Sequence, residues 1–318
     1  MPAVLVVLAV LAAGCTGSPG AESPDPPAGT PAQTPAQTPA ETPAESHGQT
    51  ATPDAPRNAE GDRLRYVALG DSYTAGPLVP TTDLADGCLR SDHNYPSLLA
   101  ARLDLDLEDV SCSGATTRDL VRRQPTVRDT SVPPQLRAVD RRTDLVTVGI
   151  GGNDLGLFST LVQSCLGLRD LDPSGSPCAD SDVGQGMLRG LGTIGDNVEQ
   201  SLIRIRERAP QARVVLVGYL RIAPSTGSCS GRLPFAGGDV TFGDRVIRGL
   251  AGELEEAARA ADVGYVDMYA ASRGHDVCSA QPWVNGREST PGVAAAFHPL
   301  LSGMRAVAGE LGVLLAED

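Results

Sequence analysis

Short apolar runs alternate with helix-forming segments over most of the chain, and this alternation limits the fold more than any other feature. The clearest run, residues 144–150, reads Asp-Leu-Val-Thr-Val-Gly-Ile, which is typical of a strand buried on both faces of a parallel sheet. We expect four further strands, at residues 66–69, 105–111, 213–218 and 263–267. Helices are expected at residues 94–103, 194–209, 240–261 and 301–315, and residues 158–181 are expected to form a long loop. This order predicts an α/β fold with a doubly wound, flavodoxin-like, five-stranded parallel sheet and helices on both faces, in three α/β/α layers.

Three of the predicted strands are followed directly by glycine and polar residues. Ser72 follows the first strand within Gly-Asp-Ser, Gly114 follows the second, and Asn153 follows the third within Gly-Gly-Asn-Asp. Because the carboxyl ends of parallel strands meet at one edge, these residues should lie close together, where open α/β sheets bind ligands. A helix beginning at Ser72 would direct free backbone amides at its hydroxyl. The plainer alternative is that Ser72 only caps that helix.

The first 61 residues differ in composition from the rest. Residues 3–13 form an apolar run that is too short to cross a bilayer, and Ala-Ala-Gly-Cys15 resembles a bacterial lipobox. We expect a signal peptide over residues 1–15 with lipidation of Cys15, and an ordinary cleaved secretory signal is the alternative. Residues 16–61 predict a disordered linker rich in proline, alanine and threonine, and residues 62–318 predict one domain. The protein should therefore be exported, either secreted or held at a membrane surface by a lipid anchor on Cys15.

The other cysteines agree with export. Six remain when Cys15 is set aside, and an even number suits disulfides formed outside the cell. Sequence alone does not decide among the allowed pairings, but chain order suggests Cys88–Cys112, Cys165–Cys178 and Cys229–Cys278.

Metal ions and nucleic acids are poorly supported as ligands. A zinc site is a poor alternative, because the chain has no Cys-x-x-Cys pair and only four histidines. Residues 170–181 resemble a calcium loop only faintly, since the twelfth position is Ser181 rather than glutamate. The net charge of −13 argues against nucleic acid as a partner. We expect no metal and no cofactor.

Four motifs together resemble the SGNH (GDSL) hydrolase superfamily. Gly-Asp-Ser72, Gly114, Gly-Gly-Asn153-Asp154 and His298-Pro299 occur in the order that the family shows. The resemblance extends from about residue 64 to the C-terminus. The six-cysteine layout, residues 276–278 and Trp283 are similar to the secreted bacterial lipase and esterase branch.

The resemblance implies a role for each motif. Ser72 would be the nucleophile, and His298 the general base that takes its proton and then protonates the leaving alcohol. The backbone amides of Ser72 and Gly114 and the side-chain amide of Asn153 would form an oxyanion hole.

One position departs from the family pattern. Members with a full triad have aspartate three residues before the histidine, where this chain has Ala295. We therefore expect a Ser72–His298 dyad in which the carbonyl of Ala295 or Ala296 orients the imidazole. A carboxylate from elsewhere, with Asp276 nearest in sequence, is the rival orienting group.

Other residues near these motifs have plainer explanations. His275 is a competing base that lacks the motif context. Asp71 should brace its turn, Asp154 should cap a helix, and Trp283 should serve packing more than substrate contact. His298, taken without its motif, could equally be a loop histidine with no chemical task.

The resemblance implies a carboxylic ester hydrolase of the lipase or esterase kind, acting as a monomer on acyl esters. Lipidic esters are favoured by the disulfide-pinned loops and the predicted membrane tether. A carbohydrate O-deacetylase or an acyltransferase could use the same residues, because loops decide the substrate. A non-catalytic envelope binding domain is less favoured, since binding alone has no need of all four motifs.

Overall fold

A five-stranded parallel sheet with the order β2-β1-β5-β6-β7 forms the centre of the computed structural model, which describes residues 61–316. The strands are β1 (Arg65–Gly70), β2 (Asp106–Asp109), β5 (Leu145–Gly149), β6 (Arg213–Val217) and β7 (Gly264–Val266). Tyr66 pairs with Leu107 on one side and Leu145 on the other, and Val146 pairs with Val214. This is the flavodoxin-like order that the sequence predicts.

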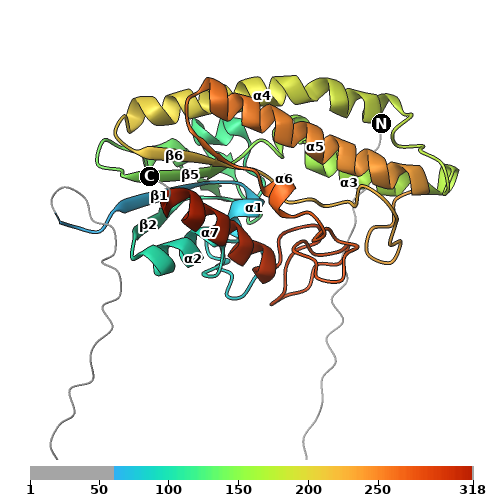
Figure 1. Cartoon of the computed structure of the whole chain (residues 1–318), viewed down its shortest axis with the longest axis horizontal. Coiled ribbons are helices and arrows are strands. Elements are labelled where there is room, and N and C mark those ends of the chain that lie inside the picture. The colour runs from blue at the N-terminus through green and yellow to red at the C-terminus, as the bar shows by residue number, and fades with distance from the viewer. Residues whose placement is uncertain (1–60, 317–318) are drawn as a thin grey trace, which may run out of the picture. The chain divides into compact units, whose positions relative to one another are not determined.

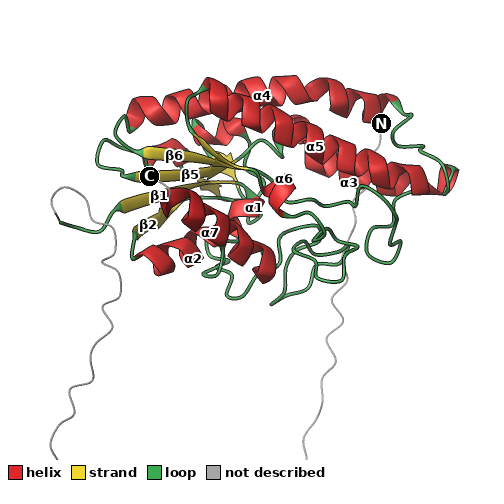
Figure 2. Ribbon diagram, in the orientation of Figure 1, coloured by secondary structure: helices red, strands yellow, loops and turns green. Residues whose placement is uncertain are grey.

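Helices cover both faces of the sheet (Figures 1 and 2). α4 (Asp182–Arg208) and α5 (Gly237–Ala260) pack together on one face, and α2 (Tyr95–Leu103) and α7 (Leu301–Ala316) pack together on the other. The buried residues of α4 recur at helical spacing and include Ile194, Val198, Leu202 and Ile205. An apolar stripe of this kind holds a helix on a sheet because burial removes it from water. The three-layer prediction is therefore confirmed.

Two predicted boundaries are wrong. Residues 158–181 are not one long loop, because α3 (Leu157–Leu168) occupies half of them and buries Leu157, Leu161 and Cys165, which are spaced four apart. α4 begins at Asp182 rather than near residue 194, after an N-cap at Ser181 whose hydroxyl accepts from the Gly184 amide. Glycines at positions 184, 186, 190 and 192 lower the helix propensity of these first turns. Packing against the rest of the domain outweighs that preference.

The remaining elements are short. They are α1 (Ser72–Ala75), η1 (Thr117–Leu120), β3 (Gln124–Pro125), β4 (Ser131–Val132), η2 (Gln135–Arg137), η3 (Asp154–Gly156), η4 (Arg169–Leu171) and α6 (Met268–Ala271). β3 and β4 form a separate antiparallel pair within the connection between β2 and β5. Within the weak calcium-like stretch, Asp172 accepts hydrogen bonds from Ser174 and Gly175 and so closes its own turn.

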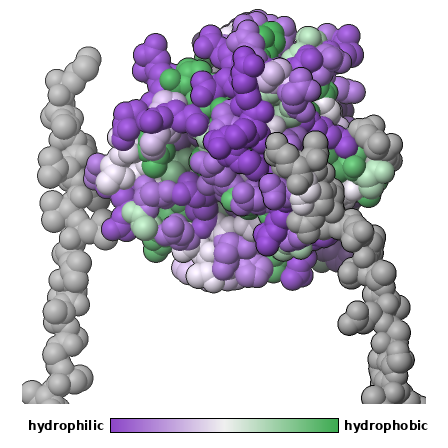
Figure 3. All heavy atoms as spheres, turned by 90° about the vertical axis from the view of Figure 1, so that its left-hand side faces the viewer, coloured by the Kyte–Doolittle hydropathy of each residue, from purple (hydrophilic) through white to green (hydrophobic). Residues whose placement is uncertain are grey.

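Three disulfides join the loops, and their pairing is the one that chain order suggests: Cys88–Cys112, Cys165–Cys178 and Cys229–Cys278. The predicted signal peptide, the lipidation at Cys15 and the linker up to residue 60 lie outside the described residues. Within residues 61–316, no helix has both the length and the apolar character needed to cross a membrane. The end of the sheet where β1 begins faces the viewer in Figure 3 and is largely hydrophilic.

Candidate active site

The nucleophile candidate, Ser72, is the first residue of α1 and follows β1 directly. Asp71, not Ser72, is the N-cap, because its Oδ1 accepts from the Tyr73 amide at 2.8 Å. Asp71 thus braces the turn, and the interpretation of Ser72 as a capping residue is wrong. Gly70 has φ +153°, and a Cβ there would collide with the Thr74 side chain and the Gly149 carbonyl. Only glycine fits this tight approach.

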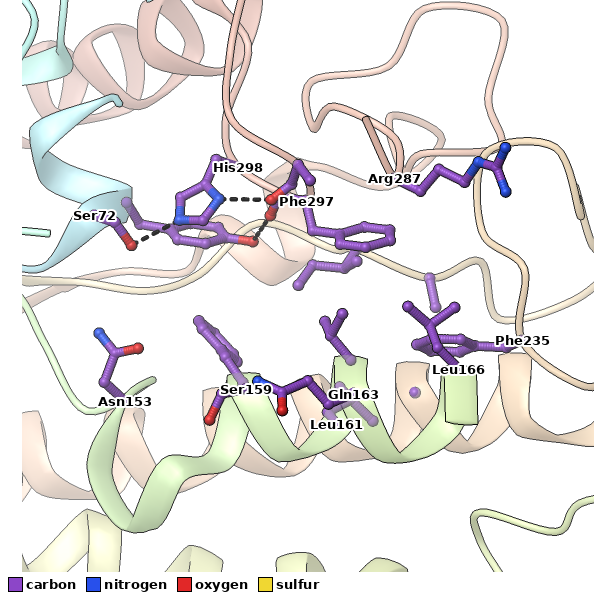
Figure 4. A pocket seen from close by; sticks show the side chains of 17 residues that line it. Ser72, Asn153, Ser159, Leu161, Gln163, Leu166, Phe235, Arg287, Phe297 and His298 are labelled. Carbon is purple, nitrogen blue, oxygen red and sulfur yellow. Dashed lines mark hydrogen bonds between the residues drawn. The ribbon is translucent and has the colours of Figure 1, made fainter. Parts of the chain in front are cut away.

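His298 faces Ser72 across the site (Figure 4). Its Nε2 lies 2.8 Å from Ser72 Oγ, and its Nδ1 lies 2.7 Å from the Ala296 carbonyl oxygen. Because a carbonyl only accepts hydrogen bonds, Nδ1 must carry the proton and Nε2 must present its lone pair to the serine hydroxyl. Burial lowers the pKa of His298, and the bond to the Ala296 carbonyl partly opposes that shift. The imidazole is therefore neutral at pH 7, the form that a general base requires.

Three groups could orient His298: the carbonyls of Ala295 and Ala296 and the carboxylate of Asp276. It is the Ala296 carbonyl that accepts the hydrogen bond from Nδ1. The Ala295 carbonyl instead accepts from the Asn285 side chain and the His298 amide, each at 3.2 Å. Asp276 accepts from the Cys278 amide at 2.9 Å and shapes its own turn.

His275, the competing base, forms its contacts with other residues of its own loop. The His275 ring stacks on Trp283, with ring centroids 4.0 Å apart and planes 6° apart. Its Nδ1 lies 2.7 Å from the Gln281 carbonyl. Within the described residues, neither ring forms a hydrogen bond or a ring contact with Ser72 or His298, so both shape the loop rather than the reacting centre.

The three predicted oxyanion donors come from three neighbouring strand ends. Gly114 has φ +82° and is exposed, so its backbone can approach a substrate closely. Asn153 donates from Nδ2 to the Ala115 carbonyl at 3.0 Å, which orients the side-chain amide beside Gly114. Among residues 61–316, the backbone amides of Ser72 and Gly114 have no protein acceptor. Both are thus available to a negatively charged oxygen.

Asp154 joins two of these segments. Its carboxylate accepts from the backbone amide and the hydroxyl of Thr117, at the start of η1. It therefore caps a short helix on a different segment from its own. The same carboxylate also accepts from Asn197 on α4 at 3.3 Å. These bonds fix the segment after Gly114 against the Asn153 turn.

A buried chain of hydrogen bonds behind Ser72 was not predicted from the sequence. The Gly152 amide donates to the Tyr219 hydroxyl at 2.7 Å, and that hydroxyl donates to Asp71 Oδ2 at 2.6 Å. Burial raises the pKa of Asp71 to about 7, although the bonds from Tyr219 and the Tyr73 amide oppose this shift. The available signal was the position of Tyr219, which follows Gly218 at the end of a predicted strand.

A mostly apolar cavity of about 370 Å³ opens beside Ser72 and His298 (Figure 4). α3 supplies one wall, and the segments after β6 supply another. The apolar lining includes Phe158, Leu161, Val162, Leu166, Ile222 and Phe235. This wall was not predicted, because residues 158–181 were expected to form a loop. The helical spacing of residues 158, 161, 162 and 166 was the signal that could have revealed it.

Comparison with known proteins agrees with this geometry. The model of the GDSL-like lipase/acylhydrolase family matches residues 68–306. Lipase 2 of Streptomyces coelicolor is 37% identical over 263 residues, covering 77% of this chain and 83% of that protein. A lipase of Streptomyces rimosus is 32% identical over 80% of this chain and 87% of that protein.

Solved structures show the same relationship. Phospholipase A1 from Streptomyces albidoflavus NA297 superposes with a TM-score of 0.66 and 27% identity, over 80% of this chain and 100% of that chain. The extracellular lipase of Streptomyces rimosus superposes with a TM-score of 0.65 and 26% identity, over 79% and 99%. The family match spans the β1 turn, the three strand ends and His298. The chain therefore belongs to the GDSL-like lipase/acylhydrolase family and is a carboxylic ester hydrolase.

Proposed function

We propose that the protein hydrolyses lipidic acyl esters through a Ser72–His298 dyad. The observation that carries this proposal is the 2.8 Å contact between His298 Nε2 and Ser72 Oγ at the mouth of an apolar cavity. A nucleophile and a base within hydrogen-bond reach are the geometry that acyl transfer requires. The cavity places apolar walls where the acyl chain of a bound ester would extend from the reacting carbonyl.

The reaction follows from these positions. Ser72 Oγ attacks the ester carbonyl while His298 Nε2 takes its proton, and the tetrahedral oxyanion accepts from the amides of Ser72, Gly114 and Asn153. The resulting imidazolium keeps its Nδ1 proton on the Ala296 carbonyl and gives its Nε2 proton to the leaving alcohol. Water then attacks the acyl-enzyme with Nε2 again acting as base, which releases the acid and restores Ser72.

The lipidic substrate class is supported by the lining of the cavity and by the relatives. An acyl chain gains about 0.8 kcal/mol per methylene that it buries, whereas a sugar would find few polar partners among the phenylalanine, leucine and valine side chains of this cavity. Two of the compared proteins are a phospholipase A1 and an extracellular lipase. Export suits the three disulfides, and a lipid anchor at Cys15 would hold the domain near such substrates.

A p-nitrophenyl ester series from acetate to palmitate tests the proposal with the wild type, Ser72→Ala and the control Ser302→Ala. Ser302 lies at the start of α7, where its hydroxyl bonds the Pro282 carbonyl. We expect hydrolysis of long-chain esters, retained in the control and reduced on the order of 10³-fold or more in Ser72→Ala. Activity confined to acetate would replace the lipidic class with a short-chain esterase or deacetylase. Full activity of Ser72→Ala on any ester would refute the assigned nucleophile.

A further inference from the structure

The hydrogen-bond partner of His298 Nδ1 is a main-chain carbonyl rather than a side-chain carboxylate. With alanine at position 295, the imidazole Nδ1 has the Ala296 carbonyl as its partner. A side-chain carboxylate can be positioned by its own rotamer, but a peptide carbonyl moves only with its backbone. Whatever fixes the backbone of residues 295–298 therefore also fixes the base against Ser72.

That backbone has an uncommon conformation at Phe297. Its φ is +57°, in the left-handed region that a bulky side chain rarely adopts. Such a residue persists only when its surroundings hold it there. The Phe297 amide donates to the Gly286 carbonyl at 3.0 Å. The Phe297 carbonyl accepts from the Tyr73 hydroxyl at 2.6 Å, within a buried environment.

Tyr73 is well placed to act on this carbonyl. It is the residue directly after Ser72, so its backbone belongs to the turn that carries the nucleophile. Its ring is itself fixed, because it packs against the rings of Phe158, Tyr219 and His298 at centroid distances of 5.4, 5.1 and 5.4 Å. A dashed line in Figure 4 joins Ser72 to His298, and another ends at Phe297, whose carbonyl accepts from the Tyr73 hydroxyl.

We propose that Tyr73 is a positioning residue whose hydroxyl, by holding the Phe297 carbonyl, keeps the Ala296 carbonyl and the His298 ring aligned with Ser72. The nucleophile turn thereby sets the position of its own base through one hydrogen bond. This bond supplies orientation that a carboxylate supplies in a full triad. The inference rests on the proposed Ser72–His298 dyad and names a further residue for the same reaction.

Tyr73→Phe tests the proposal, with Tyr66→Phe as the matched control. Both variants keep a buried ring and lose one buried hydroxyl bond, since Tyr66 lies in β1 with its hydroxyl 2.7 Å from Thr147 Oγ1. On soluble p-nitrophenyl acetate we expect Tyr73→Phe to lower kcat on the order of 10- to 100-fold with KM nearly unchanged, because a displaced base slows the chemical step. Tyr66→Phe should leave kcat at the wild-type value.

The pH profile separates positioning from general destabilisation. The Ala296 bond raises the pKa of His298 against the lowering effect of burial. Loosening that bond should therefore move the acid limb of kcat/KM to lower pH in Tyr73→Phe, and should leave it in place in Tyr66→Phe. The downfield proton resonance of His298 Nδ1 should be present in the wild type and Tyr66→Phe, and broadened in Tyr73→Phe.

Three results would overturn the inference. Wild-type kcat in Tyr73→Phe would show that the hydroxyl is not needed, and an equal loss of kcat in both variants would show a general effect of a lost buried bond. An unchanged acid limb and Nδ1 resonance alongside a lower kcat would show that Tyr73 acts on something other than the base. If wild-type hydrolysis does not depend on Ser72, the proposed function itself fails, whereas a Ser72-dependent activity that is insensitive to Tyr73→Phe removes only this inference.

Discussion

The proposed nucleophile and the proposed base come from two regions that are built in different ways. Ser72 lies in a turn on the sheet itself, where the Asp71 amide donates to the Gly149 carbonyl and the Cys112 amide to the Gly70 carbonyl, each at 3.0 Å. His298 lies near the end of residues 272–300, which contain no helix or strand of the sheet and depend on isolated bonds, such as that from the Asn285 amide to the His298 carbonyl. One half of the site thus inherits its geometry from regular structure, and the other half obtains it from single tertiary contacts.

Residues 272–300, called the base loop from here on, contain two histidines, His275 and His298, and replacing each in turn gives the largest expected effect. His298→Gln should lower kcat/KM on the order of 10⁴-fold or more, because Nε2 is the only base in contact with Ser72 Oγ among the described residues. His275→Gln is the matched control and should stay near the wild type, since His275 stacks on Trp283. Ester hydrolysis assays decide the matter, and a large loss in His275→Gln would transfer the role of base to that residue.

On the sheet side, Asn153→Ala should have the next largest effect. Removing one oxyanion donor costs on the order of 10²- to 10³-fold in kcat, and we expect KM to change little because the interaction strengthens in the transition state. Asn197→Ala, which removes an amide that bonds Asp154 on the far side of the turn, serves as control. Steady-state kinetics measures both variants, and an equal loss of kcat in Asn153→Ala and Asn197→Ala would show that Asn153 has a structural role alone.

Disulfide removal should affect the two regions unequally. Cys229–Cys278 joins the base loop to the segment after β6, with a separation of 49 residues. Cys88–Cys112 lies beside the nucleophile turn, with a separation of 24. Chain entropy predicts losses in the free energy of unfolding of about 4 and about 3.5 kcal/mol. We expect kcat to fall severalfold only in Cys229→Ser/Cys278→Ser, because the sheet still holds Ser72 in the other variant. Urea unfolding of both double variants measures the losses of stability, and steady-state kinetics measures kcat. An equal fall of kcat in the two variants would contradict the expected difference between the two regions.

Changes of pH should act on activity through the base and on stability through the nucleophile turn. The pKa of His298 is lowered from its usual 6.5, so kcat/KM should rise with pH and reach half its maximum below pH 6.5.

Burial raises the pKa of Asp71 from 3.8 to about 7, so its contribution to stability is fully present below pH 3.8 and is lost as pH rises through about 7. Urea unfolding between pH 4 and 8 should show this decline in the wild type. Asp71→Asn should remove it, and an unchanged slope would assign the decline to other groups.

The same contrast explains what could be predicted from the sequence. Local patterns predict the β1 turn, the strand ends at Gly114 and Asn153, and the sheet order. Strand periodicity and the glycines of tight turns depend on residues that are adjacent in the sequence. α3 was missed because Gly167 and several polar residues obscured its apolar spacing. The contacts of Tyr73 with Phe297 and of Tyr219 with Asp71 join residues 224 and 148 positions apart. No local pattern encodes such distant pairs.

We infer that α3 affects the choice of substrate more than the chemistry. It contributes Phe158, Leu161, Val162 and Leu166 to the cavity, and the Cys165–Cys178 disulfide closes the segment on itself. None of these side chains forms a hydrogen bond with Ser72 or His298 within the described residues. Phe158 also packs against the Tyr73 ring, so mutations at Leu161, Val162 and Leu166 are the ones expected to alter which acyl groups are accepted while the reacting atoms stay in place.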